Sequence, residues 1–260
     1  MKNHVLLLFL VKRYRYPLLI GCSIALMAGV LWLRYDHRSV EQQWQLVPDL
    51  GVRVPLGYAI HGIDVSRHNS RIDWQRVRRV QVNGVPLQFA FIKATEGATL
   101  IDKSFARNWT GAGQAGLRRG AYHFYHPTRD PVKQADNFIR RVTLKTGDFA
   151  PVLDFEVMNG QPDANILRDL HIWLDAIEDH YGQKPIIYTN AYLYKRFIKG
   201  HLADYPLWIA DYSNAHLRQY DQTNLYLWQH NKSGLVPGIA GMVDINTFVQ
   251  EPDDLQKICL

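Results

Sequence analysis

Eight β-prone runs recur after residue 57, and they constrain the fold of this chain more than any other feature. They are Tyr58–Val65, Leu87–Ala94, Gly120–Tyr125, Ala150–Val157, Pro185–Thr189, Leu207–Asp211, Leu225–Gln229 and Met242–Val249. Segments with helical periodicity follow the first five runs, at Ile72–Val80, Lys103–Ala115, Pro131–Val142, Ala164–Tyr181 and Ala191–Ile198. The gaps between the last three runs are too short for crossover helices. The alternation predicts an α/β fold, an irregular TIM-like β/α barrel of five β/α units followed by three strands.

The fourth run contains Pro151–Val157, a short apolar stretch that carries two acids. Because side chains alternate along a strand, Asp154 and Glu156 share one face, while Leu153 and Phe155 share the other. Two carboxylates so close together near a buried strand end repel each other and resist desolvation, so one should keep its proton at an unusually high pH. A protonated acid beside an ionised one is what glycosidic cleavage requires. The alternative is a strand end whose acids point into water.

The ends of other predicted strands also carry acids and aromatic residues. The acids are Asp64, Asp154 with Glu156, Asp211, and Asp244 within the last strand, and the aromatic residues are Tyr125, Tyr188 and Trp228. Active sites of β/α barrels lie at the carboxyl ends of the strands, so the sequence predicts a pocket of acids with an aromatic, sugar-stacking wall. Single acids at such positions often cap the next helix, an alternative that fits Asp64 or Asp211 but poorly fits the pair.

The N-terminal segment predicts a membrane anchor. Pro17–Leu33 contains seventeen residues without a charge and is preceded by Lys12, Arg13 and Arg15. By the positive-inside rule, residues 1–37 form a cytoplasmic stub and a single membrane-spanning helix, with the rest of the chain outside. We expect a bacterial inner-membrane protein with a periplasmic or extracellular domain. Residues 38–57 are expected to be a linker and residues 58–260 the barrel.

Two alternatives to an uncleaved anchor remain open in this segment. A signal peptidase could remove it, although no clean cleavage site follows the apolar run. Leu19–Cys22 also resembles a bacterial lipoprotein box, but the run continues beyond Cys22 to Leu33.

The net charge of +6 does not indicate a nucleic-acid partner. Residues 1–38 hold six basic residues against one acid, leaving 30 − 6 = 24 basic and 24 − 1 = 23 acidic residues in the remainder. The basicity therefore belongs to the N-terminus and not to a binding face. The two cysteines define no disulfide framework, and the oligomeric state is not predicted.

Seven motifs, in order, resemble glycoside hydrolase family 25, the N-acetylmuramidases or lysozymes. They are His61–Asn69, Phe91–Gly97, Gly120–Phe124, Pro151–Glu156, Trp208–Ala210, Trp228–Gln229 and Val243–Asn246. The resemblance covers about residues 58–250 and implies an incomplete β/α barrel. It implies cleavage of the β-1,4 bond between N-acetylmuramic acid and N-acetylglucosamine in peptidoglycan, without a cofactor or required metal.

The resemblance also implies roles for four acids. Glu156 matches the family's general acid/base, Asp154 its assisting partner, and Asp64 and Asp244 the further acids of the pocket. We expect Tyr125, Tyr188, Asp211 and Trp228 to bind substrate. The membrane anchor lies outside the resemblance and favours action on the cell's own wall. The competing interpretations are a non-catalytic peptidoglycan-binding protein and a hydrolase of another N-acetylhexosamine polymer, such as chitin.

Overall fold

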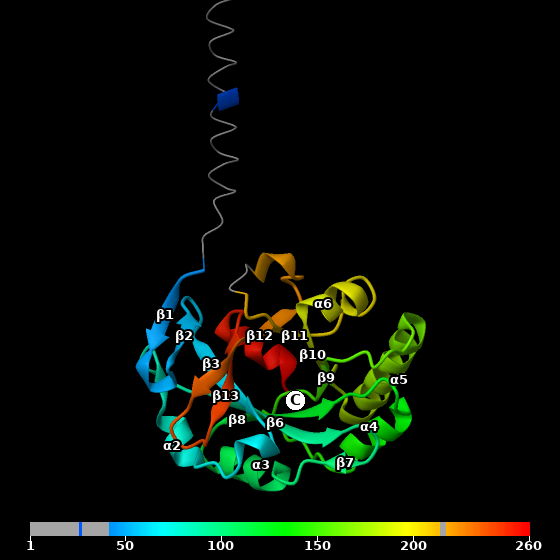
Figure 1. Cartoon of the computed structure of the whole chain (residues 1–260), viewed down its shortest axis with the longest axis horizontal. Coiled ribbons are helices and arrows are strands. Elements are labelled where there is room, and N and C mark those ends of the chain that lie inside the picture. The colour runs from blue at the N-terminus through cyan, green and yellow to red at the C-terminus, as the bar shows by residue number, and fades with distance from the viewer. Residues whose placement is uncertain (1–25, 28–41, 214–216) are drawn as a thin grey trace, which may run out of the picture. The chain divides into compact units, whose positions relative to one another are not determined.

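The computed structural model describes residues 26–27, 42–213 and 217–260 (Figure 1). The chain divides into two units, Met1–Gln42 and Gln43–Leu260. The predicted membrane-spanning segment, Pro17–Leu33, lies outside the described residues except for Leu26 and Met27. Within the described ranges, no helix has the length and apolar character needed to cross a bilayer.

The second unit is built around a closed barrel. Its sheet has nine strands in the order β3-β13-β12-β11-β10-β9-β8-β6-β7, and β3 also pairs with β6, so that eight strands close the barrel while β7 pairs only with β6. The bounds are β3 Ile60–Val65, β6 Phe89–Glu96, β7 Leu100–Ile101, β8 Arg118–Phe124, β9 Val152–Phe155, β10 Ile186–Asn190, β11 Leu207–Ala210, β12 Leu225–Leu235 and β13 Met242–Phe248. All eight predicted strands are therefore confirmed as the barrel strands.

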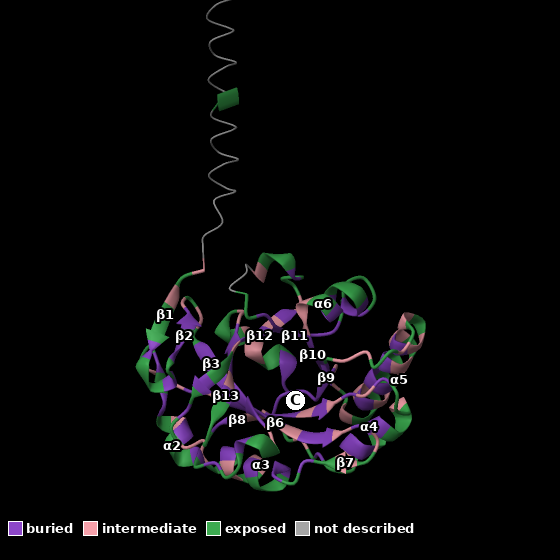
Figure 2. Cartoon of the chain, in the orientation of Figure 1, coloured by how far each residue is buried: buried purple, intermediate pink, exposed green. Residues whose placement is uncertain are grey.

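The helices follow the first five barrel strands, as predicted. They are α2 Trp74–Arg79, α3 Phe105–Gln114, α4 Pro131–Ile139, α5 Asp163–Tyr181 and α6 Ala191–Leu193, the last continuing as a π-helical turn over Tyr194–Ile198. In the described residues after β11, the connections carry only the short 3-10 turn Leu217–Gln219. Figure 2 shows that the helices around the barrel combine buried and exposed residues, as amphipathic helices over a core do.

One strand departs from the parallel arrangement. β13 pairs antiparallel with both β12 and β3, whereas the other barrel strands pair in parallel. A short connection after β12 permits this, because antiparallel neighbours need no crossover helix. The start of β13 therefore lies at the same end of the barrel as the carboxyl ends of the other strands.

Large aromatic side chains fill the barrel interior. Phe91 stacks on Trp208 with ring centroids 4.4 Å apart, and Phe89 packs edge-to-face against Phe91 at 5.7 Å. Glycines on the neighbouring strands make room for these rings. A Cβ at Gly62 would lie 2.3 Å from the Phe89 ring, and one at Gly120 would lie 2.1 Å from the Phe91 ring.

The C-terminus closes the opposite end of this interior. The 3-10 helix Pro252–Ile258 leads to Cys259, which forms an antiparallel bridge with Phe149. Ile258 is buried with the interior cluster, and its carbonyl accepts a hydrogen bond from the Ala150 amide at 2.9 Å. The C-terminal segment therefore lies at the end of the barrel where β9 begins.

The predicted linker of residues 38–57 is wrong over most of its length. Residues 44–55 form an antiparallel hairpin of β1 Trp44–Val47 and β2 Val52–Pro55, joined by the 3-10 turn Pro48–Leu50. Leu50 and Val54 are both 0% exposed and belong to the main hydrophobic core. The alternating buried residues are too few for a strand pattern to stand out in the sequence, and burial against β12 stabilises the hairpin. A smaller hairpin, β4 Gln81–Val82 and β5 Val85–Pro86, precedes β6.

We predict that Leu50→Ala lowers the free energy of unfolding by about 2–5 kcal/mol, because it leaves a cavity in a packed core. Leu46→Ala in the same hairpin is the matched control, since Leu46 is 57% exposed, and its effect should stay within about 0.5 kcal/mol. Urea unfolding of both variants measures the difference. Equal, small effects would show that the hairpin is not part of the cooperative fold.

Candidate active site

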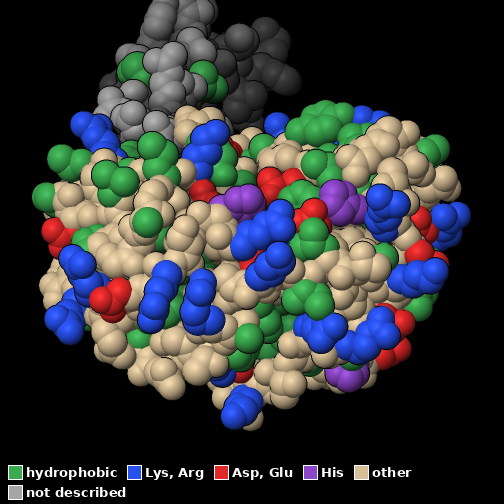
Figure 3. Space-filling model, turned by 60° about the horizontal axis from the view of Figure 1, so that its bottom comes forward, with side chains coloured by type: hydrophobic (Ala, Val, Ile, Leu, Met, Phe, Trp, Pro, Cys, Tyr) green, Lys and Arg blue, Asp and Glu red, His purple; other side chains and the backbone are tan. Residues whose placement is uncertain are grey.

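A cavity of about 180 Å³ opens where the parallel strands end. It is lined by Asp64, Ser66, His68, Lys93, Tyr122, Phe124, Asp154, Glu156, Tyr188, Trp208, Gln229 and Asp244. All four predicted catalytic acids are thus brought together in one cavity. The face shown in Figure 3 carries a group of acidic side chains between two histidines, with Lys and Arg side chains beside them.

Asp154 and Glu156 form the first acid pair. Asp154 is buried near the end of β9, whereas Glu156 follows the strand and stays accessible to solvent. Burial raises the pKa of Asp154 well above its usual range, and the neighbouring charge of Glu156 raises it further. Burial by the cavity walls also raises the pKa of Glu156, against the hydrogen bond from Asp154. The two neighbouring acids therefore each lose their proton at a higher pH than an isolated carboxyl group does.

Asp64 and Asp244 form the second acid pair. They are directly opposite in the β3–β13 register, so their side chains leave neighbouring strands on the same face. Burial raises the pKa of Asp64, and Asp244 raises it further. Burial likewise raises the pKa of Asp244 to about 6, while its hydrogen bond with Asp64 opposes that shift. Both pairs thus resist full ionisation. Within the described part of the chain, no cluster of three or more His, Cys, Asp or Glu side chains suits a metal ion.

Two amides fix Asp64 in place. Gln229 Nε2 and Asn246 Nδ2 both donate to Asp64 Oδ2, at 2.7 and 2.8 Å. Gln229 Oε1 in turn accepts hydrogen bonds from the hydroxyls of Tyr188, at 2.8 Å, and Tyr212. Every donor in this network comes from a different segment of the barrel end, which fixes the orientation of the carboxylate before any ligand binds.

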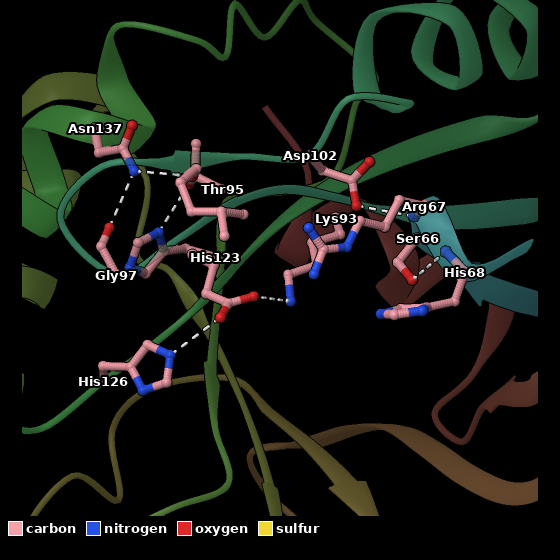
Figure 4. A network of polar contacts seen from close by, with 12 residues as sticks. Ser66, Arg67, His68, Lys93, Thr95, Gly97, Asp102, His123, His126 and Asn137 are labelled. Atoms are coloured by element: carbon pink, nitrogen blue, oxygen red, sulfur yellow. Dashed lines mark hydrogen bonds and ion pairs between the residues drawn. The ribbon is translucent and has the colours of Figure 1, made fainter. Parts of the chain in front are cut away.

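Lys93 places a positive charge beside the first acid pair. Its Nζ donates to Glu96 Oε2 at 2.7 Å and lies 4.5 Å from the centroid of the Phe124 ring. Glu96 Oε1 lies 3.2 Å from His126 Nε2, so that Lys93, Glu96 and His126 form a chain leading away from the cavity (Figure 4). Lys93 and Glu96 thus form a salt bridge. Lys93 opposes the rise of the Glu156 pKa that burial causes.

The family assignment follows from comparison with known proteins. Residues 63–239 match the family model described as glycosyl hydrolases family 25, which covers more than half of the chain. This chain belongs to glycosyl hydrolase family 25. It is therefore a glycosidase, as the resemblance implied.

The chain is also similar to known proteins in sequence and in structure. The protein YegX of Escherichia coli K12 is 42% identical over 81% of this chain and 77% of its own length. Lysozyme M1 of Streptomyces globisporus is 31% identical over 73% of this chain and 67% of its own length. A family 25 glycosyl hydrolase from Bacillus anthracis has a TM-score of 0.70 at 29% identity, covering 78% of this chain and 94% of that one.

Three of the predicted substrate-binding residues do not line the cavity. Tyr125 is 0% exposed and Trp228 is 1% exposed, and both belong to the core between the barrel and its outer layer. The Asp211 carboxylate instead accepts hydrogen bonds from Ser213, Gln219 and Tyr220. Burial alone would raise the pKa of Asp211, but these hydrogen bonds outweigh it and lower the pKa. These positions do not support the sugar-binding roles predicted for them.

The residues that take their places follow from strand alternation. Tyr122 and Phe124 on β8 face the cavity, and Tyr125 follows on the opposite face. On β12, Gln229 faces the cavity and Trp228 faces outward. The two-residue period of a strand predicts that Tyr122, Phe124 and Gln229 face the cavity. The choice of aromatic residues at strand ends instead pointed to Tyr125 and Trp228.

The raised pKa of Asp244 should make the free energy of unfolding depend on pH. The pKa of Asp244 is raised to about 6 in the folded protein, so folding binds a proton between the unfolded value of 3.8 and about 6. Stability contributed by this group is present below the unfolded pKa and is lost as the pH rises through the folded one. Asp244→Asn should therefore be the more stable protein at pH 8, by up to about 3 kcal/mol, and should lose that advantage at pH 4. Denaturant unfolding at both pH values measures the difference, and a difference independent of pH would contradict it.

Proposed function

We propose that this glycosidase hydrolyses peptidoglycan at the β-1,4 bond between N-acetylmuramic acid and N-acetylglucosamine. The observation that carries the proposal is the Asp154–Glu156 pair, two neighbouring acids that line one cavity at the end of the barrel and whose pKa values are both raised by burial. Glycoside cleavage needs a proton donor at the glycosidic oxygen. Relatives named as an autolytic lysozyme of Clostridium acetobutylicum and lysozyme M1 support the substrate class.

Glu156 acts as the general acid and then as the general base. It is the more accessible member of the pair, and burial raises its pKa above that of a free carboxyl group, which favours the protonated form that a general acid needs. Once the leaving sugar departs, the Glu156 carboxylate accepts a proton from the water that completes hydrolysis. Lys93 keeps the pair from taking up a second proton, because its ammonium group favours the ionised form.

Asp154 assists from the same side of the bond. Its Oδ1 is buried and accepts no hydrogen bond from the described residues, so it offers an acceptor to the substrate. The N–H of a 2-acetamido group can donate to this oxygen, which would orient the acetamido carbonyl toward the anomeric carbon. The carbonyl oxygen then forms a bond to that carbon as the glycosidic bond breaks, and Glu156 protonates the departing oxygen. Muramic acid supplies the acetamido group, and water then displaces its oxygen from the anomeric carbon, so this route retains the configuration at that carbon.

Asp64 and Asp244 position the sugar ring that is cleaved. The Asp64 carboxylate is held by Gln229 and Asn246, and Asp244 lies next to it on β13. Acceptors fixed in this way suit the hydroxyl and amide groups of an N-acetylated sugar. Tyr122 and Phe124 are partly buried and line the cavity wall, where their rings offer apolar faces on which the sugar can stack.

Glu156→Gln tests the proposal, because it preserves the shape of the side chain but cannot deliver a proton. Its turnover of purified peptidoglycan should fall by at least about 10²–10⁴-fold, with wall binding and unfolding midpoint retained. Glu251→Gln, at an exposed position before the C-terminal 3-10 helix, is the matched control and should keep full turnover.

The products of the same digest identify the bond. The new reducing ends should be N-acetylmuramic acid, as reduction with borohydride followed by mass spectrometry determines. Reducing-end N-acetylglucosamine would contradict the proposed bond. Wall binding without cleavage by the unaltered protein would instead favour the non-catalytic alternative, and cleavage of chitin oligomers in preference to peptidoglycan would favour the other-polymer alternative.

A further inference from the structure

A second groove, of about 510 Å³, adjoins the β1–β2 hairpin, and we name it the hairpin groove. Trp44 and Arg53 form its wall on the hairpin side, and Tyr212, His230 and Lys232 contribute to its other walls. The family match begins at residue 63, so the hairpin side is built from residues outside the matched segment. The hairpin groove is thus an addition to the part of the barrel that the family model describes.

A hydrogen bond links the hairpin groove to the catalytic cavity. The Tyr212 hydroxyl, in the groove, hydrogen-bonds with Gln229 Oε1, and Gln229 Nε2 donates to Asp64 at 2.7 Å. Lys232 also lies close enough to Asp244 to oppose the rise in the Asp244 pKa that burial causes. The residues that line the hairpin groove are therefore direct neighbours of residues that line the catalytic cavity.

The charge of the hairpin groove is positive. Arg53 and Lys232 are exposed, and neither forms an ion pair with a carboxylate in residues 42–213 or 217–260. No acid is among the groove's lining residues, and burial lowers the pKa of His230 to about 3, so that this ring adds no charge. The Lys232 ammonium lies 5.5 Å from the centroid of the Tyr212 ring, which holds it at the groove.

The wall of the groove is rigid on the hairpin side. The Trp44 ring packs edge-to-face on Trp228 at 5.3 Å and on His230 at 5.8 Å. Both partners are buried, so Trp44 is fixed while part of its surface remains accessible. A fixed indole beside two unpaired cations suits a ligand that carries both apolar groups and carboxylates.

We propose that the hairpin groove binds the acidic stem peptide of the muramic acid residue being cleaved. This inference rests on the proposed function. Muramic acid carries its stem peptide on a lactyl ether, so the peptide must leave the catalytic cavity along a neighbouring surface. The free carboxylates of that peptide match Arg53 and Lys232, and its alkyl side chains match Trp44. The hairpin groove thereby selects peptide-bearing glycan over bare glycan.

The double variant Arg53→Gln/Lys232→Gln tests the proposal in the full chain. Two substrates are compared, purified peptidoglycan with intact stem peptides and the same glycan after an amidase has removed them. The measured quantity is the ratio of kcat/KM on the first substrate to kcat/KM on the second. The unaltered protein should favour the peptide-bearing glycan, and the double variant should reduce that ratio about three- to tenfold.

Arg141→Gln/Lys145→Gln is the matched control, because it removes two exposed positive charges away from the groove and should leave the ratio unchanged. A ratio in the Arg53→Gln/Lys232→Gln variant equal to that of the unaltered protein would overturn the inference while leaving the proposed function intact. An equal fall in both double variants would also overturn it, by showing that only net charge matters. Failure of the unaltered protein to cleave either glycan would overturn the proposed function and this inference together.

Discussion

The close contact of two carboxyl groups at the end of β9 is the constraint on which the site depends. Asp154 lies on β9 and Glu156 directly follows the strand, two residues further on, so the two carboxyl groups are neighbours in one cavity. Burial raises the pKa of both acids, and the neighbouring charge of Glu156 raises the pKa of Asp154 further. This places an acid and its partner on the same side of a bound sugar. The other residues at this end of the barrel, among them Asp64, Asp244 and Lys93, line the same cavity.

The antiparallel direction of β13 completes the arrangement. It brings Asp244 to the end of the barrel where the parallel strands terminate, opposite Asp64. A parallel last strand would place the early residues of β13 at the closed end, which the C-terminal segment fills. The acids can therefore come from both parallel and antiparallel strands and still line one cavity.

The barrel and its four acids were predictable from the sequence, because both follow from local pattern. Strand and helix periodicities place the eight strands, and acids at strand ends then fall at one end of the barrel. Two predicted residues, Tyr125 and Trp228, lie in the core, and Tyr122 and Gln229 line the cavity instead. The prediction chose aromatic residues at strand ends, but the two-residue period of the strand decides which side chain faces the cavity.

The hairpin at Trp44–Pro55 and the amide network could not be predicted in the same way. The hairpin is stabilised by burial against β12, a contact between segments about 180 residues apart, and its own sequence gives little signal. Gln229 and Asn246 meet Asp64 only through closure of the barrel, since they lie 165 and 182 residues away in the chain. Such contacts depend on tertiary structure and have no local signature.

The central claim is that the two acids act from one side of the sugar, so that the acetamido group of the substrate forms the bond to the anomeric carbon. Retaining enzymes that use a carboxylate nucleophile place their two carboxyl groups about 5–5.5 Å apart, on opposite sides of the bond. Incubation with a 2-fluoro glycoside that lacks the acetamido group, followed by intact mass measurement, tests the claim most directly. We predict no covalent adduct, together with inhibition by a thiazoline analogue of the bicyclic intermediate. An adduct mapped to Asp154 would contradict the account.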